Sequence, residues 1–202
     1  MEASWFIFDL GNTVIKLAYE RVMENICKRS TLTRDELVEL FEEPGGYRDL
    51  ERGAVKFSDF HEFLREKGGY RGALEDLRET WSGFFDGLLP GIEDLLARLR
   101  RRYRIAFLSN SNEVHADVIP KKFSTVFEPD DRLIFSHRFH CAKPDPELFR
   151  RALEVIGALP QQAVFVDDLL ENVLAARATG MTAFQFHDAF QLERELKYAG
   201  LL

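Results

Sequence analysis

The chain alternates between short apolar runs that lack a polar face and longer segments in which apolar residues recur every three or four positions. The first such run, Trp5–Phe8, stops at Asp9. Aromatic and β-branched residues favour strands, and a continuous apolar run suits a strand buried on both faces of a parallel sheet. Comparable runs lie at residues 104–109, 133–135, 163–166 and 182–186. The pattern predicts buried strands separated by amphipathic helices.

Between residues 16 and 86 the apolar spacing is helical. It predicts a helix over residues 19–29 and another over 74–84. Thr33 and Glu36 have capping-box spacing and predict a helix that continues to Phe41. Ser58 is expected to cap one more helix, and no strand is expected anywhere in this stretch. The segment is therefore interpreted as a helical insertion.

From Leu89 onward, helical and strand patterns alternate. Asp145 and Pro146 predict the N-cap and first turn of a helix that Gly157 closes. Alternating strands and helices imply right-handed βαβ units and a parallel sheet. The expected fold is α/β, a Rossmann-like parallel sheet with helices on both faces. Its core is expected at residues 1–15 and 87–202, with an inserted α-helical cap at residues 16–86.

Length and composition narrow the class of protein. A chain of 202 residues, 46% of them hydrophobic, can form one domain with an insertion. The net charge of −7 argues against a nucleic-acid partner but allows a small anionic substrate. Cys27 and Cys141 match no zinc spacing, and no apolar run is long enough to span a membrane. We expect a soluble cytoplasmic protein, and the sequence leaves its oligomeric state open.

Polar side chains end three of the predicted strands. Asp9 ends the first, Ser109 ends another, and Asp167 and Asp168 end a third, while Lys143 precedes a predicted helix. Strands of a parallel sheet end at one edge, and ligands bind there in open α/β sheets. One such aspartate could simply cap a turn. Polar groups at three strand ends favour a binding site.

Together these groups suit the chemistry of phosphate esters. Clustered carboxylates are suitable ligands for Mg²⁺, which often also binds a substrate phosphate. The Ser109 hydroxyl and nearby backbone N–H groups can hold phosphate oxygens, and Lys143 can offset the negative charge that the carboxylates and phosphate share. An aspartate can then act as the nucleophile and form an aspartyl phosphate.

Four segments resemble, in order, the motifs of the haloacid dehalogenase (HAD) superfamily, in its phosphatase branch with a helical cap after the first strand. The segments are Asp9-Leu10-Gly11-Asn12-Thr13, Phe107-Leu108-Ser109-Asn110, Lys143-Pro144 and Val166-Asp167-Asp168. Within the superfamily, the Asp-Leu-Gly-Asn form looks most like that of bacterial glucose-1-phosphate phosphatases. The resemblance implies a Mg²⁺-dependent phosphatase for a small phosphorylated metabolite, with sugar phosphates among the candidates.

The same resemblance assigns roles to individual residues. It implies that Asp9 is the nucleophile and that Lys143 assists catalysis. It implies a phosphate site formed by Ser109, Asn110 and Lys143. It also implies a metal site formed by Asp9, the Gly11 carbonyl, Asp167 and Asp168, of which Asp168 is the expected direct ligand and Asp167 binds directly or through water.

Gly11 departs from the family pattern. Most of these phosphatases carry a general acid/base two residues after the nucleophile, and glycine cannot transfer a proton. Losing an acid/base group costs roughly 10²–10⁴-fold in rate. The enzyme could therefore favour good leaving groups, turn over slowly or use another residue. Replacement acids could be Asp49, Glu51, His61, His137 or His140.

Two other functions remain open at this stage. A 2-haloacid dehalogenase needs no acid beside its aspartate, but Asp167 and Asp168 would repel its carboxylate substrate. A protein that binds phosphate ligands without turnover is the other alternative. Away from the site, His115 is expected in a loop or at the surface, and Trp81 is expected in the core of the cap.

Overall fold

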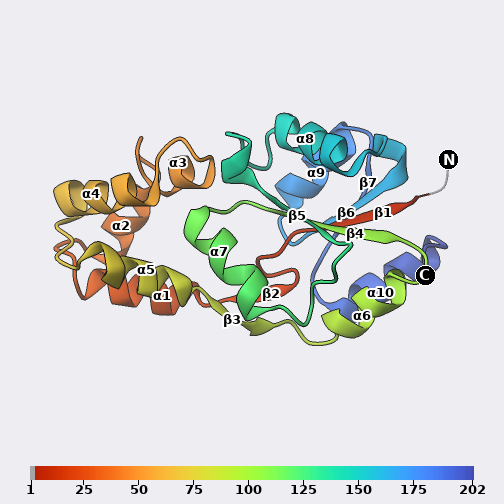
Figure 1. The fold of residues 1–202 in the computed structure, drawn as a ribbon, viewed down its shortest axis with the longest axis horizontal. Coiled ribbons are helices and arrows are strands. Elements are labelled where there is room, and N and C mark those ends of the chain that lie inside the picture. The colour runs from red at the N-terminus through yellow and green to blue at the C-terminus, as the bar shows by residue number, and fades with distance from the viewer. Residues whose placement is uncertain (1–2) are drawn as a thin grey trace.

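The computed structural model describes residues 3–202 and has a five-stranded sheet at its centre (Figure 1). All neighbouring strands pair in parallel. In spatial order the strands are β5 (Arg132–Phe135), β4 (Arg104–Ser109), β1 (Trp5–Phe8), β6 (Ala163–Asp167) and β7 (Thr182–Gln185). The predicted α/β, Rossmann-like class is confirmed.

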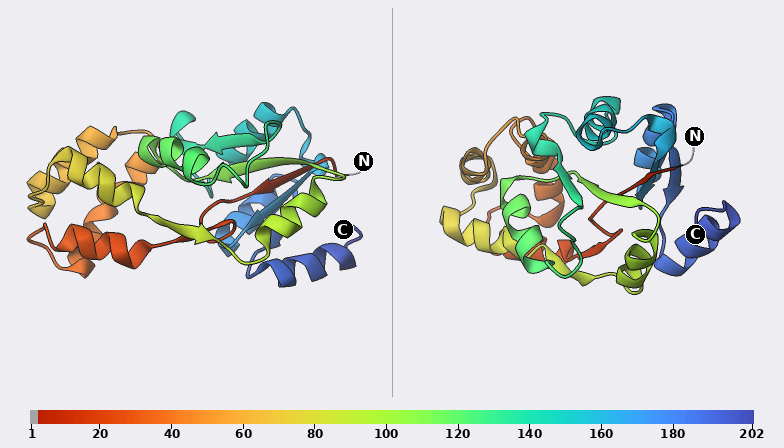
Figure 2. Two further views of the ribbon diagram at one scale, coloured as in Figure 1. Left: turned by 60° about the horizontal axis from the view of Figure 1, so that its bottom comes forward. Right: turned by 45° about the vertical axis from the view of Figure 1, so that its right-hand side comes forward.

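Helices cover both faces of this sheet (Figures 1 and 2). One face carries α6 (Ile92–Leu99) and α10 (Ala189–Tyr198), and the other carries α8 (Pro146–Ile156) and α9 (Leu170–Ala178). Side chains of β1 alternate between two apolar clusters, Phe6 and Phe8 in one and Trp5 and Ile7 in the other. Both faces of β1 are therefore buried, as its continuous apolar run predicts.

Five helices form a lobe beyond one end of the sheet (Figure 1). They are α1 (Tyr19–Cys27), α2 (Arg34–Phe41), α3 (Tyr47–Glu51), α4 (Phe57–Gly68) and α5 (Leu74–Ser82). The capping box of α2 is confirmed, since the Thr33 N–H donates to Glu36 at 2.8 Å and the Glu36 N–H donates to Thr33 at 3.4 Å. We refer to these five helices as the cap.

Two expectations about the cap were wrong. Residues 16–86 were expected to contain no strand, yet β2 (Ile15–Leu17) pairs with β3 (Phe85–Leu88) in an antiparallel ribbon at the base of the cap. Strands this short show too little alternation to be recognised, and their partners are far apart in sequence. Ser58 does not cap α4, because the Asp59 carboxylate accepts the Lys56 N–H at 3.1 Å and the helix starts at Phe57.

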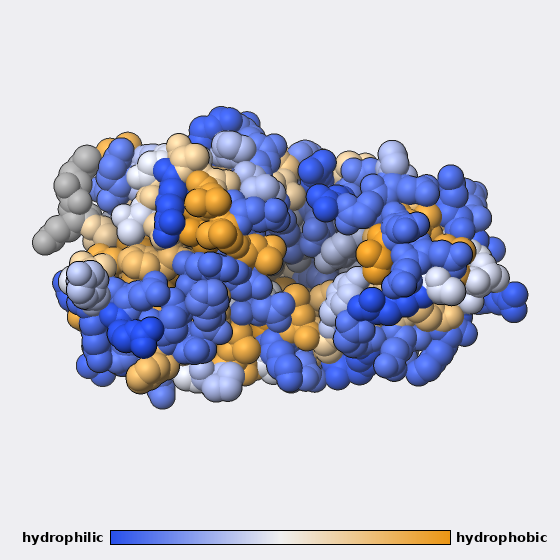
Figure 3. Space-filling model, turned by 180° about the vertical axis from the view of Figure 1, so that it is seen from behind, coloured by the Kyte–Doolittle hydropathy of each residue, from blue (hydrophilic) through white to orange (hydrophobic). Residues whose placement is uncertain are grey.

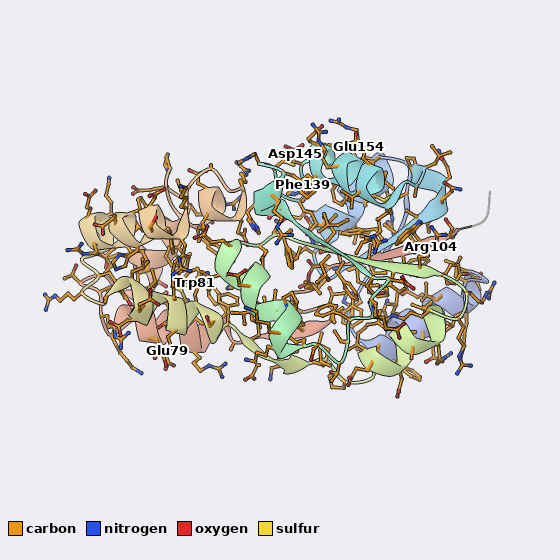
Figure 4. All side chains as sticks on the ribbon, viewed as in Figure 1. Glu79, Trp81, Arg104, Phe139, Asp145 and Glu154 are labelled. Carbon is orange, nitrogen blue, oxygen red and sulfur yellow. The ribbon has the colours of Figure 1, made fainter. Side chains whose placement is uncertain are left out.

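Helix α7 (Glu113–Lys122) follows β4 and packs against α5 of the cap. Figure 4 shows Trp81 of α5 on the side of the cap that faces α7. Two single-turn 3₁₀ helices, η1 (Ser136–Arg138) and η2 (Pro160–Gln162), complete the described elements. The contact between α5 and α7 is one place where the cap meets the sheet-bearing lobe.

Another contact between the cap and the sheet-bearing lobe joins the end of α3 to η1. The Ser136 hydroxyl donates a hydrogen bond of 2.5 Å to the Glu51 carbonyl oxygen. Just beyond, Gly53 has a φ of 65°, and a Cβ at this position would lie 2.2 Å from the His137 carbonyl oxygen. Only glycine allows the two backbones to come this close. We call this contact the α3–η1 joint.

Replacing Gly53 by Ala is expected to destabilise the protein more than the same change at Gly157. Both glycines have left-handed backbones, with φ of 65° and 62°, so both variants incur about 1–2 kcal/mol of backbone strain. A Cβ at Gly157 meets nothing within 4 Å, whereas one at Gly53 collides with His137. Urea unfolding of both variants measures the difference, and equal losses of unfolding free energy would contradict the close packing of the joint.

The face seen from behind is mostly hydrophilic (Figure 3). Seen from behind, hydrophobic residues gather in patches that are larger on the sheet-bearing lobe than on the cap (Figure 3). Among residues 3–202, no helix has both the length and the apolar composition that crossing a bilayer requires.

Candidate active site

Asp9 stands at the carboxyl end of β1, in the middle of the sheet. Its backbone N–H donates to the Val166 carbonyl at 2.8 Å, which keeps β1 paired with β6 up to this residue. The chain then turns sharply, with Asn12 at a left-handed φ of 50°, a conformation that asparagine tolerates better than most residues. The Asn12 side chain accepts the Leu17 N–H at 3.2 Å. This turn places Asp9 and Gly11 on the wall of a cavity.

Lys143 joins two of the aspartates. Its ammonium nitrogen lies 2.5 Å from Asp9 Oδ1 and 2.7 Å from Asp167 Oδ2. All three side chains are buried, with 7% or less of each residue exposed. Hydrogen bonds between charged groups in a buried site are short and strong. Lys143 therefore fixes the carboxylates of β1 and β6 relative to each other.

Asn110 fixes the backbone of Lys143. The Asn110 amide nitrogen donates to the Lys143 carbonyl at 2.9 Å, and its oxygen accepts the Lys143 N–H at 2.8 Å. After Lys143 the chain enters α8 through Asp145, whose carboxylate accepts the Glu147 N–H at 2.9 Å, as predicted for an N-cap (Figure 4). The loop is thus held at both ends, which orients the lysine toward the carboxylates.

The three aspartates form a cluster of oxygen ligands. Carboxylate oxygens of Asp9, Asp167 and Asp168 lie within 4.8 Å of one another. Asp167 is already engaged, since it accepts hydrogen bonds from Lys143, from the Leu169 N–H at 2.9 Å and from Asn172 at 2.9 and 3.0 Å. Asp168 is more exposed and lines the same cavity. Such hard oxygen ligands suit a divalent cation such as Mg²⁺.

The electrostatics of the cluster also favour a cation. Burial raises the pKa of Asp9 to about 7, with further contributions from Asp167 and Asp168, although Lys143 acts in the opposite direction. Burial and Asp167 likewise raise the pKa of Asp168. Burial alone would lower the pKa of Lys143, but its attraction to Asp167 and Asp9 raises it. One ammonium does not compensate three carboxylates, so a bound divalent cation would relieve their repulsion.

All the residues predicted from the sequence motifs line one cavity of about 240 Å³. They are Asp9, Gly11, Ser109, Asn110, Lys143, Asp167 and Asp168. The Ser109 hydroxyl, which donates to the Asn110 carbonyl at 3.3 Å, is close enough to this space to reorient toward a bound anion. The side chain of Asn110 is occupied by the Lys143 backbone, so any contribution of Asn110 to anion binding would come from its own backbone.

The cavity also has walls that the motifs do not contain. Tyr47 and Glu51 of α3 line it from the cap, and the apolar part is formed by Leu17, Phe84, Phe85 and Ile119. Helix α3 was not predicted, because its five residues follow a Pro-Gly-Gly break and show no periodicity. The only sequence signal for Glu51 was its place among the possible replacement acids.

His115 was expected in a loop or at the surface, and this expectation was wrong. His115 lies in α7, is 3% exposed and lines the cavity. Its ring packs against Trp81, Phe84 and Phe85, at centroid distances of 6.1, 5.2 and 4.8 Å. Burial lowers its pKa to about 3, so the ring is neutral. The four-residue spacing of His115 and Ile119 on one helix face could have indicated this position.

Sheet, site and cap together define a capped α/β protein with an acidic cluster, suited to a divalent cation, at the carboxyl edge of its parallel sheet. The sequence model of haloacid dehalogenase-like hydrolases matches residues 4–180, and the chain belongs to this family.

Known relatives specify the branch of the family. The chain is 25% identical over 195 residues to D-ribitol-5-phosphate phosphatase of Bacteroides thetaiotaomicron, covering 94% of this chain and 95% of that protein. A HAD family enzyme from the same species, solved with magnesium and inorganic phosphate, superposes with a TM-score of 0.79 at 26% identity, covering 93% of this chain and 96% of that one. The chain is therefore a HAD-like phosphatase, a phosphoric monoester hydrolase.

The fold alone is shared more widely. L-2-haloacid dehalogenase from Xanthobacter autotrophicus superposes with a TM-score of 0.66 at 18% identity, covering 96% of this chain and 82% of that one. Sheet and cap are thus common to enzymes of different chemistry, and the distinction between them rests on the residues of the site.

Proposed function

We propose that the protein is a Mg²⁺-dependent phosphatase for a small phosphorylated sugar or polyol, and that it works through an aspartyl phosphate on Asp9. The observation that carries the proposal is the cluster of Asp9, Asp167 and Asp168, whose oxygens lie within 4.8 Å of one another beside the Lys143 ammonium. The cluster supplies a nucleophile, a cation site and a fixed positive charge in one cavity.

In this proposal the metal site consists of Asp9, the Gly11 carbonyl and Asp168, with Asp167 bound directly or through water. Bound Mg²⁺ would neutralise phosphate charge and so let two anionic groups approach. Lys143 also reduces the repulsion between Asp9 and the phosphate, because its positively charged ammonium group is hydrogen-bonded to the Asp9 carboxylate. The hydrogen bonds that Asp167 accepts from Asn172 and Leu169 keep its carboxylate in place.

The reaction divides into two displacements at phosphorus. A carboxylate oxygen of Asp9 attacks, the bond from phosphorus to the leaving oxygen breaks, and the phosphoryl group is held on Asp9 as an acyl phosphate. Water then attacks the same phosphorus and regenerates the carboxylate. Lys143 and the Ser109 hydroxyl stabilise the phosphoryl oxygens in both steps. Asn110 contributes by orienting Lys143 and through its own backbone N–H.

The cavity favours a small substrate. A cavity of about 240 Å³ can accommodate a phosphate group together with a few carbon atoms. Polar groups of Tyr47 and Glu51 on one wall suit hydroxylated carbons, and the D-ribitol-5-phosphate phosphatase that the chain resembles is named for such a substrate. We therefore place phosphorylated alditols and sugars first among the substrates to be tested.

Phosphate release is expected from at least one phosphorylated alditol or sugar when Mg²⁺ is present, and it is expected to stop when EDTA removes the metal. The reason is that unscreened carboxylates repel the phosphate. The test is inorganic phosphate release by the purified protein across a panel of such esters, with Mg²⁺ restored after EDTA as the control. Absence of release from the entire panel would contradict the proposal.

Measurements on the same purified protein distinguish the phosphatase from the two alternatives, a 2-haloacid dehalogenase and a binding protein without turnover. Halide release from a 2-haloacid without metal would identify a dehalogenase, which the fold alone permits. Saturable binding of a phosphate ester with no product would identify a binding protein. The acidic pair Asp167 and Asp168 argues against the dehalogenase, because both would face a carboxylate substrate.

A further inference from the structure

The cavity has no acid at the position where most phosphatases of this family carry one. Position 11 is glycine, and a Cβ there would lie 3.0 Å from the Leu17 side chain, so this wall is closed by an apolar group. An alkoxide leaving group is a strong base, and its departure needs a proton. If the protein hydrolyses esters of ordinary alcohols, as proposed above, another group in the cavity must supply that proton.

Four of the five candidate acids do not line the cavity. The Asp49 carboxylate accepts the Gly45 N–H at 2.7 Å inside the cap. His61 is buried in the cap, with Nε2 at 2.9 Å from the Gly72 carbonyl. His137 and His140 belong to the segment after β5, and neither lines the cavity.

Glu51 is the candidate that lines the cavity. It does so together with Asp9, Ser109 and Lys143, and it comes from the cap, opposite the edge of the sheet. Lys143 lines the same cavity, and its positive charge lowers the pKa of Glu51 against the effect of burial. A proton donor must approach the leaving oxygen from the side where the organic part of the substrate lies. The cap wall is that side.

The position of Glu51 is fixed by the residues that follow Ser109. Two residues after Ser109, the Ser111 N–H donates to the Ser136 hydroxyl oxygen at 2.8 Å, and that hydroxyl donates to the Glu51 carbonyl at 2.5 Å. Gly53 then packs on the His137 carbonyl in the α3–η1 joint. A short chain of contacts thus connects the phosphate-binding strand end to Glu51.

We propose that Glu51 is the general acid and base of this phosphatase and takes the role that the residue at position 11 has in most relatives. In the first step Asp9 bonds to phosphorus, the bond between phosphorus and the alcohol oxygen breaks, and that oxygen takes the Glu51 carboxyl proton. In the second step the Glu51 carboxylate removes a proton from water while the water oxygen bonds to phosphorus and the bond between phosphorus and the Asp9 oxygen breaks. The products are alcohol and inorganic phosphate, and Glu51 is protonated again.

The surroundings of Glu51 suit both protonation states. Burial raises the pKa of Glu51 to about 7. A hydrogen bond from Tyr47 and the positive charges of Lys143 and Arg48 lower this pKa, and the negative charge of Glu42 raises it slightly. An acid with a pKa near the working pH can give and take a proton efficiently. This electrostatic setting agrees with the assignment that the geometry makes.

Replacing Glu51 by Gln is expected to lower kcat/KM for an alkyl phosphate by roughly 10²–10⁴-fold, the usual acid contribution. For p-nitrophenyl phosphate, whose leaving group needs no proton, we expect the same substitution to lower kcat/KM by less than about tenfold. With that ester a burst of p-nitrophenol before a slower steady state is also expected, because water attack lacks its base. Glu43→Gln removes a charge from an exposed ion pair with Lys67 in the same cap and should leave both substrates unaffected.

The pH profile provides a readout that a purely structural role would not change. The first step needs protonated Glu51, so kcat/KM of the wild type for the alkyl phosphate should fall as the pH rises through about 7. This descending limb should be absent in Glu51→Gln. Tyr47→Phe removes a hydrogen bond that lowers the pKa of Glu51, so the limb should move to higher pH.

Several outcomes would overturn the assignment. They are an unchanged kcat/KM of Glu51→Gln for the alkyl phosphate, an equal loss on both substrates, or a descending limb that survives in this variant. The role of Glu51 rests on the proposed phosphatase function, but different results would refute the role and the function. A wild type that releases no phosphate refutes the phosphatase, whereas an active wild type with an equally active Glu51→Gln refutes only the role of Glu51.

Discussion

Asp9→Asn is expected to abolish Mg²⁺-dependent phosphate release and to leave the fold intact. An amide is a poor nucleophile and a weaker ligand for a hard cation, so the variant loses both proposed functions of Asp9. Loss of a catalytic nucleophile typically lowers kcat on the order of 10⁶-fold. The measurement is phosphate release from the best substrate of the panel, together with the circular dichroism spectrum of the variant.

The stability of this variant follows from the direction of the pKa shift. Burial raises the pKa of Asp9 from 3.8 to about 7, so the folded protein favours the neutral side chain. Ionisation of Asp9 therefore costs stability increasingly as the pH rises above 3.8, and the full cost is reached above about 7. Asparagine avoids this cost. In metal-free buffer at pH 8 we expect Asp9→Asn to be at least as stable as the wild type.

A surface aspartate provides the matched control. Asp130 is exposed and lies just before β5, at the end of the sheet opposite the site, so Asp130→Asn should change neither activity nor stability appreciably. Measurable turnover by Asp9→Asn, beyond contaminating wild-type enzyme, would remove Asp9 as the nucleophile. Loss of fold in Asp9→Asn but not in Asp130→Asn would instead show that Asp9 is needed for stability.

The sheet and its polar edge could be predicted because each depends on local sequence. A buried parallel strand is an apolar run, and a polar residue at its end lies at the sheet edge whatever the rest of the chain does. Asp9, Ser109 and Asp167 could therefore be assigned to one edge before any coordinates were known, and they line one cavity. Lys143 lies in a loop and ends no strand, so its place in the site was inferred from its position before a predicted helix and from its charge, and the motif resemblance then agreed.

The cap side of the cavity could not be predicted in this way. Glu51 reaches the cavity because the α3–η1 joint brings the end of α3 against residues 136–137, about 85 positions later in the chain. Such a contact depends on tertiary packing, and α3 is too short to produce a periodic pattern. His115 was misplaced for the same reason, since its burial comes from aromatic residues of the cap and β3. Sequence patterns therefore predict the residues at the sheet edge better than those of the cavity wall that the cap provides.

Lys143→Met is expected to reduce both activity and stability. The lysine is hydrogen-bonded to Asp9 at 2.5 Å and to Asp167 at 2.7 Å, and removing one partner of buried charges typically costs about 3–5 kcal/mol of unfolding free energy. Loss of a fixed charge that stabilises the transition state typically costs about 10²–10³-fold in kcat. Urea unfolding and phosphate release measure the two effects, and Lys28→Met, at an exposed position, is the control.

The pH dependence of this variant distinguishes lost charge pairing from lost packing. Lys143 lowers the pKa of Asp9, so its removal should raise that pKa from about 7 to a higher value and increase the cost of ionising Asp9. The stability loss should therefore be larger at pH 8 than at pH 5, where Asp9 of the folded protein is largely protonated. Adding Asp167→Asn to Lys143→Met removes a second uncompensated charge and should restore part of the stability but none of the activity. A loss that is equal at both pH values and unchanged by Asp167→Asn would mean that Lys143 contributes mainly by packing, and the electrostatic account of the site would then be wrong.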